Sequence, residues 1–266
     1  PAPAVPSDPD GFMIHIAAKL GALLPGAAVK ADGMTLLVTR PGGHAIPFDE
    51  RGYYRLCGEA AFQCDSALDQ ALRRAADLLA APSVPGLRVA LRRVADCAGE
   101  PKSCTAAPSR EPMAPLSRRA FAHLETVCVK LTPAGGYAPV TNADGADLRL
   151  GVEAALDTCE NSTRAALGPL APAPPGTDGV AGIAGPFAAS RALFAADGAA
   201  LAAGGHLLIA LPQRDLLLYI QGDGPEQIAA LAAHARDAVP ASGLAIGPDV
   251  YRWSAAGWSP ATGNGP

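Results

Sequence analysis

The chain has 266 residues, a formal net charge of −4 and 17% charged residues. This weakly acidic balance, with no basic stripe, argues against a partner such as nucleic acid or an anionic membrane surface. No apolar run reaches the roughly 20 residues that cross a bilayer, so we expect no membrane insertion. About half of the residues are apolar, which is enough for a stable core.

The chain begins with residues 1–11, a lead-in rich in proline. Proline at this density predicts an extended, solvated segment. The segment has neither the basic nor the apolar region of a signal peptide. Such a lead-in is common just after a cleaved signal, and it also occurs where a sequence has been cut.

Residues 12–97 are expected to form an N-terminal α+β module. Apolar residues recur at helical spacing over 12–24, and Pro25 follows them as a stop signal. Residues 27–48 contain an Asp-Gly turn and a Pro-Gly-Gly turn, which divide the segment into three short stretches. Each stretch is predicted to form a strand.

A second helix and a further strand are expected in the same module. Asp65 or Ser66 would cap the helix, because a clean apolar stripe follows as far as Leu79. Residues 86–97 alternate as a strand whose arginines face water.

Residues 98–117 are rich in proline and predict an excursion between modules. Residues 118–168 then predict a central module with one strand and one helix. Along the strand, Cys128 and Lys130 lie on one face and the neighbouring valines on the other. The helix is expected over residues 146–167.

Residues 169–179 carry the strongest boundary signal and predict a Pro/Gly linker. The C-terminal α+β module, residues 180–260, should hold a short strand at 180–184, a helix at 187–203, a hairpin of two apolar runs, another helix and a final strand pair. A tail of residues 261–266 follows. The predicted fold class is therefore α+β, with two or three modules that each combine helices with an antiparallel hairpin.

Six cysteines point to an oxidising compartment. They are Cys57, Cys64, Cys97, Cys104, Cys128 and Cys159. An even count with two matched short spacings is typical of structural disulfides, and free buried thiols are the first alternative. Zinc knuckles and redox C-x-x-C motifs need closer pairs than any present here. We therefore expect a disulfide-stapled protein that is periplasmic or secreted.

Geometry limits the first cysteine pair. In one unbroken helix, the Cα atoms of Cys57 and Cys64 would lie about 10 Å apart, too far for a disulfide. Either the chain turns near Gly58 or these cysteines have other partners. The connectivity of all six stays open, because six cysteines allow fifteen pairings.

The C-terminal hairpin is interrupted by Arg214 and Asp215, between two strongly apolar runs. The simplest interpretation is a tight turn with a solvated arginine, since aspartate accepts local backbone N–H bonds. A second interpretation places the pair beside Arg191, where the guanidinium groups would hold a carboxylate or phosphate of a ligand or partner. In a third, these charges pair with one another and lock the module.

Aromatic residues are few, and both tryptophans lie near the C-terminus. Tyr251 and Trp253 would either cap the core of the last module or belong to a surface for a ligand or partner, where such side chains contribute most. Trp258 fits either role.

Common catalytic and cofactor motifs are missing from the sequence. It has no G-x-S-x-G, no paired metal-ligating histidines and no phosphate-loop lysine. The acidic stretch from Asn142 to Glu153 only partly matches a calcium loop, because Gly145 stands at the fourth position instead of the sixth. We expect no metal and no cofactor.

The stretches "SRALFAADGAALAAGGHLLIALPQRDLLLYIQ" and "VYRWSAAGW" carry a family resemblance. Over residues 186–259 the chain resembles the C-terminal part of the YtpQ-like family of uncharacterised bacterial proteins. The resemblance implies a helix, then an apolar-Pro-x-Arg-Asp hairpin, then a last strand with a short aromatic tail. This chain differs from that family in its six cysteines and proline-rich insertions. The family has no established activity, so the resemblance implies no reaction.

Two functions remain open. The leading expectation is a protein without catalytic residues that acts by binding a ligand or a protein partner through Arg191, Arg214, Asp215, Tyr251 and Trp253. The alternative is a hydrolase or transferase with a dispersed site, in which Asp215 or Glu125 acts as general base and Arg191 or Arg214 holds an anionic group.

Overall fold

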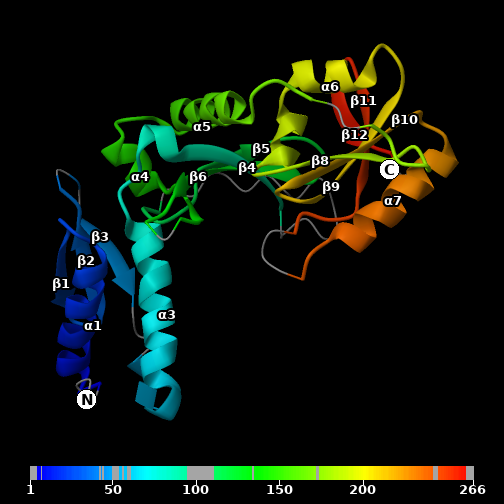
Figure 1. Ribbon diagram of the computed structural model, residues 1–266. Helices are drawn as coiled ribbons and strands as arrows, with labels where there is room; N and C mark the ends of the chain where they lie inside the picture. Colours follow the sequence, from blue (N-terminus) through cyan, green and yellow to red (C-terminus); the bar gives the residue numbers. More distant parts are fainter. Residues whose placement is uncertain are drawn as a thin grey trace. The chain divides into compact units, whose positions relative to one another are not determined.

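The structure, a computed structural model, describes residues 5–6, 8–41, 43, 45–49, 54–55, 57–58, 61–94, 111–133, 135–171, 174–241 and 245–261. Its helices and strands form a mixed α+β fold with three antiparallel sheets, which confirms the predicted fold class (Figure 1). The chain divides into two compact units that alternate along the sequence. Unit 1 comprises residues 1–86, 110–115 and 130–153, and unit 2 comprises residues 87–109, 116–129 and 154–266.

Unit 1 is built around two helices and the sheet β1-β2-β3. The elements are α1 (Pro9–Leu23), β1 (Ala28–Asp32), β2 (Thr35–Thr39), β3 (Ala45–Asp49) and α3 (Ala61–Leu79). Helix α1 packs against β1, β2 and α3 (Figure 1). The core of the unit includes Phe12, Ile16, Leu36 and Leu72, all at most 1% exposed.

The predicted start of α3 at Asp65 or Ser66 is wrong. The helix begins at Ala61, because its apolar stripe extends back through the buried Cys64. Unit 1 also contains the 3-10 turn η1 (Val84–Gly86), β7 (Tyr137–Pro139) and α4 (Asn142–Asp147).

A second sheet has the order β4-β6-β5, with β7 paired to β6. Its strands in unit 2 are β4 (Leu87–Arg93), β5 (Ser117–Arg119) and most of β6 (Leu124–Leu131). Helix α5 (Val152–Leu167) is joined to this sheet by a hydrogen bond from Val89 N to Thr163 Oγ1, 2.7 Å long.

The single helix predicted over 146–167 is in fact two helices, α4 and α5. The break falls where Arg149 adopts a left-handed backbone with φ of 56°. Leu150 N then donates to Gly145 O, which closes the end of α4.

The third sheet, with the order β12-β11-β9-β10-β8, forms the centre of the C-terminal part of unit 2. Its strands are β8 (Ala181–Ala184), β9 (Leu207–Gln213), β10 (Leu216–Gln221), β11 (Val250–Ser254) and β12 (Gly257–Pro260). Helix α7 (Pro225–Ala238) covers one face, and the turn η3 (Ala188–Leu193) and helix α6 (Ala195–Ala202) contribute to the cover of the other (Figure 1). Strand β9 is therefore buried on both sides from Leu207 to Pro212.

The helix predicted over 187–203 is also divided, into η3 and α6. The backbone of Phe194 is extended between them, and its buried ring lies 4.6 Å from the guanidinium carbon of Arg164. The predicted strand at 180–184, the hairpin, the following helix and the last strand pair are all present.

Disulfides join Cys57 to Cys64 and Cys128 to Cys159. The Cα atoms of the first pair lie 4.7 Å apart, which rules out one unbroken helix between them. The second disulfide ties β6 to α5. Cys97 and Cys104 lie outside the described residues, as do residues 262–266 of the tail and most of the proline-rich excursion. None of the helices in the described ranges is long and apolar enough to cross a membrane.

Candidate functional site

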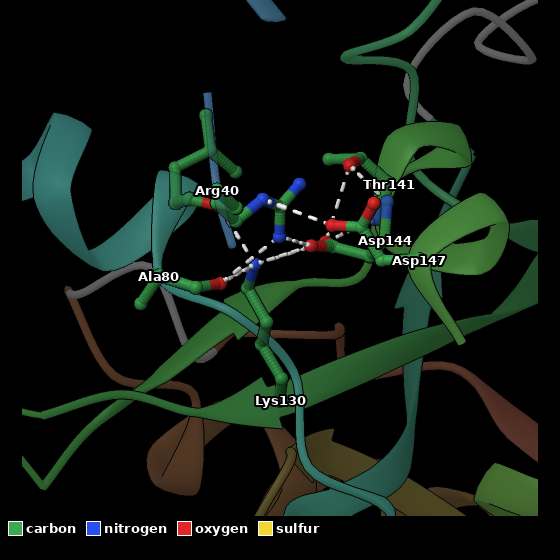
Figure 2. Close-up of polar contacts among 7 residues, drawn as sticks. Arg40, Ala80, Lys130, Thr141, Asp144 and Asp147 are labelled. Carbon is green, nitrogen blue, oxygen red and sulfur yellow. Dashed lines mark hydrogen bonds and ion pairs between the residues drawn. The ribbon is translucent and has the colours of Figure 1, made fainter. Parts of the chain in front are cut away.

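Unit 1 contains a buried network of charged side chains that the sequence analysis missed (Figure 2). Asp144 of α4 is fully buried and accepts hydrogen bonds from Arg40 Nη1 at 2.5 Å and from Lys130 Nζ at 2.8 and 2.9 Å. Thr141 N donates to the same carboxylate at 2.8 Å, and Asp144 N in turn donates to Thr141 Oγ1. Arg40 Nε also lies 3.1 Å from Asp147 Oδ2.

Lys130 is the central cation of this network. Its Nζ atom has three donors, which are taken by Asp144, Leu78 O and Ala80 O (Figure 2). Burial lowers the pKa of Lys130 from its usual value, against the attraction of Asp144. Two cations face two carboxylates here, and no donor of Lys130 is left for a ligand. The network therefore acts as an internal tie between β2, the end of α3, β6 and α4.

The signal for this tie was present in the sequence. Lys130 shares a strand face with Cys128, and that face is buried. The acidic stretch at Asn142–Asp147 forms α4 with a capping box in which Asp144 and Thr141 bond reciprocally. Within the described ranges, no group of three or more His, Cys, Asp or Glu side chains is arranged to hold a metal ion.

Arg191 lies in the interior of unit 2, with 6% of its surface exposed. Its Nη1 atom donates to Asp197 Oδ2 at 2.9 Å, and its Nη2 atom donates to Leu167 O at 2.8 Å. The guanidinium also reaches the carbonyls of Gly168 and Pro169. Arg191 thus binds the carbonyl groups at the end of α5, where a cation is favoured by the helix dipole.

Arg214 and Asp215 form the two-residue turn between β9 and β10. They pair with each other through two bonds of 2.8 Å. Asp215 Oδ1 also accepts from Phe187 N at 2.9 Å, and the guanidinium carbon of Arg214 lies 4.9 Å from the centre of the Phe187 ring. The backbone of Phe187 is left-handed, with φ of 62°. The Arg214–Asp215 turn therefore fixes the backbone bend at Phe187, at the start of η3. The hydrogen bond from Arg214 holds the pKa of Asp215 below its usual value.

Tyr251 belongs to a polar group formed by three distant segments of unit 2. Its hydroxyl lies 3.0 Å from His123 Nε2, and the same nitrogen lies 3.1 Å from Asp249 Oδ2. Arg93 pairs with Asp249 from the end of β4. Hydrogen bonding to His123 lowers the pKa of Asp249, while burial raises the pKa of Tyr251. His123, Asp249 and Arg93 are each partly exposed, so solvent reaches this group.

Trp253 and Trp258 lie against each other across the β11–β12 hairpin, with ring centres 4.8 Å apart. Trp258 Nε1 donates to Ala192 O at 2.7 Å. Trp253 covers Gly198 of α6, where an added Cβ atom would lie only 2.9 Å from the indole ring. Both rings therefore fix α6 and η3 to the sheet.

A cavity of about 520 Å³ opens in unit 2 at the end of β10. Its apolar wall includes Ala200 and Leu201 of α6 with Tyr219 and Ile220 of β10. Its polar side chains are Asp178 before β8, Gln221 at the end of β10 and Gln227 of α7. The volume falls within the range of about 300–1,000 Å³ that is typical of small-molecule sites.

Asp178 connects this cavity to α7. Its Oδ1 atom accepts from Val180 N at 3.2 Å, and its Oδ2 atom contacts His234 Nε2. The hydrogen bonds from His234 and Val180 lower the pKa of Asp178, so the carboxylate is anionic at neutral pH. Asp178 lies in the segment predicted as a linker, and the sequence analysis did not select any residue of this cavity.

No protein-family model, no curated protein and no solved structure matches this chain.

Proposed function

We propose that this protein binds a small molecule in the unit 2 cavity and acts outside the cytoplasm, in the periplasm or after secretion. The observation that carries the proposal is the composition of the cavity wall. Apolar side chains from α6 and β10 meet three polar side chains there, Asp178, Gln221 and Gln227. Mostly apolar walls with a few placed polar groups are typical of ligand sites.

The surrounding structure supports a preformed site. The cavity wall is made by the ends of β10 and α6, the first turn of α7 and residues 175–179 before β8. The two helices and the strand enclose the core of the third sheet. A site on rigid elements loses little free energy to ordering when the ligand binds. The residues selected from the sequence are engaged internally, since Arg191, Arg214 and Asp215 each bind other parts of the chain.

Two disulfides support the location outside the cytoplasm, because disulfides persist in oxidising compartments and are rare in the cytosol. We also propose that residues 186–259 resemble the YtpQ-like family. This resemblance does not indicate which ligand is bound.

Native mass spectrometry tests the proposed binding. Protein from the periplasm of a bacterial host should carry a discrete excess mass that disappears on denaturation. Ala200→Trp should remove this mass, since residue 200 is an exposed lining position on α6, where an indole would take up space that the ligand needs. Ala199→Trp is the matched control, because residue 199 is exposed on the same helix and is not part of the lining.

Two results would contradict the proposal. One is an apo mass for the wild-type protein that stays unchanged after incubation with a periplasmic small-molecule extract. The other is an excess mass that Ala200→Trp and Ala199→Trp retain equally.

The second candidate is a hydrolase or transferase with a dispersed site, and the group of His123, Asp249, Tyr251 and Arg93 favours it. The Nε2 atom of His123 meets both the carboxylate of Asp249 and the hydroxyl of Tyr251, and an imidazole held in this way can transfer a proton when a substrate lies within hydrogen-bond reach. Glu125 pairs with Arg92 at 2.6 Å on the adjoining strands. On this second candidate, the wild-type protein should turn over a member of an ester or phosphoester panel, and His123→Ala should abolish that turnover without lowering the melting temperature. No turnover by the wild-type protein would contradict it.

A further inference from the structure

We infer that the unit 2 cavity selects an amine, that is, a small molecule with an apolar body and a protonated nitrogen that binds Asp178. This inference rests on the proposed function and names the ligand class of the same site.

Charge is the first observation. Among the residues that the structure describes, the lining contains the carboxylate of Asp178 and no Lys or Arg side chain. Hydrogen bonds from His234 and Val180 keep Asp178 ionised. An ammonium group therefore meets an opposite charge in this cavity, whereas a carboxylate or phosphate would meet a like charge without a compensating lining cation.

Unused acceptor capacity is the second observation. An ionised carboxylate has about four lone-pair directions. The contacts with Val180 N and His234 Nε2 use one on each oxygen of Asp178, which leaves the others for a ligand donor. Gln221 Nε2 donates to Leu201 O at 2.5 Å, so the amide oxygen of Gln221 remains available as a second acceptor.

The rest of the cavity wall determines the body of the ligand. Leu201, Tyr219 and Ile220 provide aliphatic and aromatic surface in the same lining. Apolar contact with these side chains would hold an alkyl or aryl group, while Asp178 would orient the nitrogen. A volume of about 520 Å³ accommodates a molecule the size of 2-phenylethylamine with room for water.

Isothermal titration calorimetry with three matched probes tests this inference. The probes are 2-phenylethylammonium, 2-phenylethanol and phenylacetate, which share an aryl group and differ mainly in charge. The ammonium probe should bind about three- to fivefold more tightly than the alcohol, in line with the strength of a partly exposed ion pair, and phenylacetate should bind most weakly. Asp178→Asn should remove the preference for the ammonium probe.

The variants keep the result interpretable. Asp178→Asn should fold, because an amide oxygen can still accept from Val180 N, and its melting temperature checks this. Asp223→Asn is the matched control, since Asp223 is an aspartate of similar exposure with its own histidine partner, His206 at 3.3 Å, and is not part of the lining. Asp223→Asn should leave the order of the three probes unchanged.

The outcomes separate this inference from the proposed function. If the three probes bind equally, or if phenylacetate binds best, and Ala200→Trp weakens that binding, the amine inference is overturned while the binding function stands. If no probe binds and the wild-type protein carries no ligand, both are overturned. An ammonium preference that survives in Asp178→Asn also overturns the inference, because the charge would then be recognised elsewhere.

Discussion

Replacing Asp144 by alanine is expected to destabilise unit 1 more than any surface charge change. The carboxylate accepts hydrogen bonds from Arg40, Lys130 and Thr141, and Lys130 is fully buried. Its removal leaves two buried cations with Asp147 as the remaining carboxylate of the network. Leaving a buried charge without its partner costs about 3–5 kcal/mol, a large part of the 5–15 kcal/mol that is typical of a whole domain.

The double variant Lys130→Met/Asp144→Ala measures the coupling. Each single substitution should lower the free energy of unfolding by about 3–5 kcal/mol. The double substitution should lower it by about 2 kcal/mol less than the sum of the two single effects, since Arg40 stays paired with Asp147. The exposed pair Lys19–Asp69, also 2.8 Å long, is the control in the same unit, and its variants should change stability by less than about 1 kcal/mol.

Hydrogen exchange read by mass spectrometry is the suitable assay, because it reports protection along α1 and α3. Tryptophan fluorescence follows unit 2 instead, since both tryptophans, Trp253 and Trp258, belong to that unit. Additive effects of Lys130→Met and Asp144→Ala, within about 0.5 kcal/mol, would show that these side chains do not share a network and would refute the reasoning.

Three further changes test the roles assigned in unit 2. Arg191→Met should lower the unfolding free energy by about 2–4 kcal/mol in a urea titration and leave probe binding unchanged, because carbonyls at the end of α5 lose their donor. Cys128→Ala/Cys159→Ala should cost about 3–4 kcal/mol, as expected for a disulfide that closes a separation of 31 residues. The pKa of Asp215 is lowered from 3.8 by Arg214, so its contribution to stability is present above about pH 4 and is lost as the pH falls through the lowered value. The difference in melting temperature between wild type and Asp215→Asn should therefore shrink below pH 4.

The fold elements could be predicted where local periodicity determined them. The stripe of α1 and the apolar runs of β9 and β10 were clear in the sequence, and the structure has these elements in the predicted places. The break between α4 and α5 could not be predicted, because it depends on a left-handed backbone at Arg149 rather than at a glycine. No local sequence pattern predicts a left-handed backbone at an arginine.

The charged network was missed for a different reason. Arg40 and Asp144 stand 104 positions apart, and their contact exists only after β2 and α4 have packed into the same unit. Alternation placed Lys130 beside Cys128 on one strand face. A cation on a face that also carries a disulfide cysteine had to find internal acceptors once that face was buried. The alternation along β6 therefore identifies the buried cation but not its partners.

The most visible polar residues of the sequence, Arg191 and Arg214, stand among apolar neighbours, and that position explains their internal contacts. A guanidinium buried or half-buried beside apolar strands must be hydrogen-bonded, and the nearest acceptors belong to the chain itself. A cavity arises in the opposite way, where side chains are too short to fill the space between the ends of elements. Ala200 of α6 and Gly179 before β8 line the cavity because neither reaches across it. Periodicity and charge patterns draw attention to large residues and to charged residues among apolar ones. A site built from alanine, glycine, two glutamines and Asp178 in a predicted linker therefore becomes visible only when its walls are placed in space.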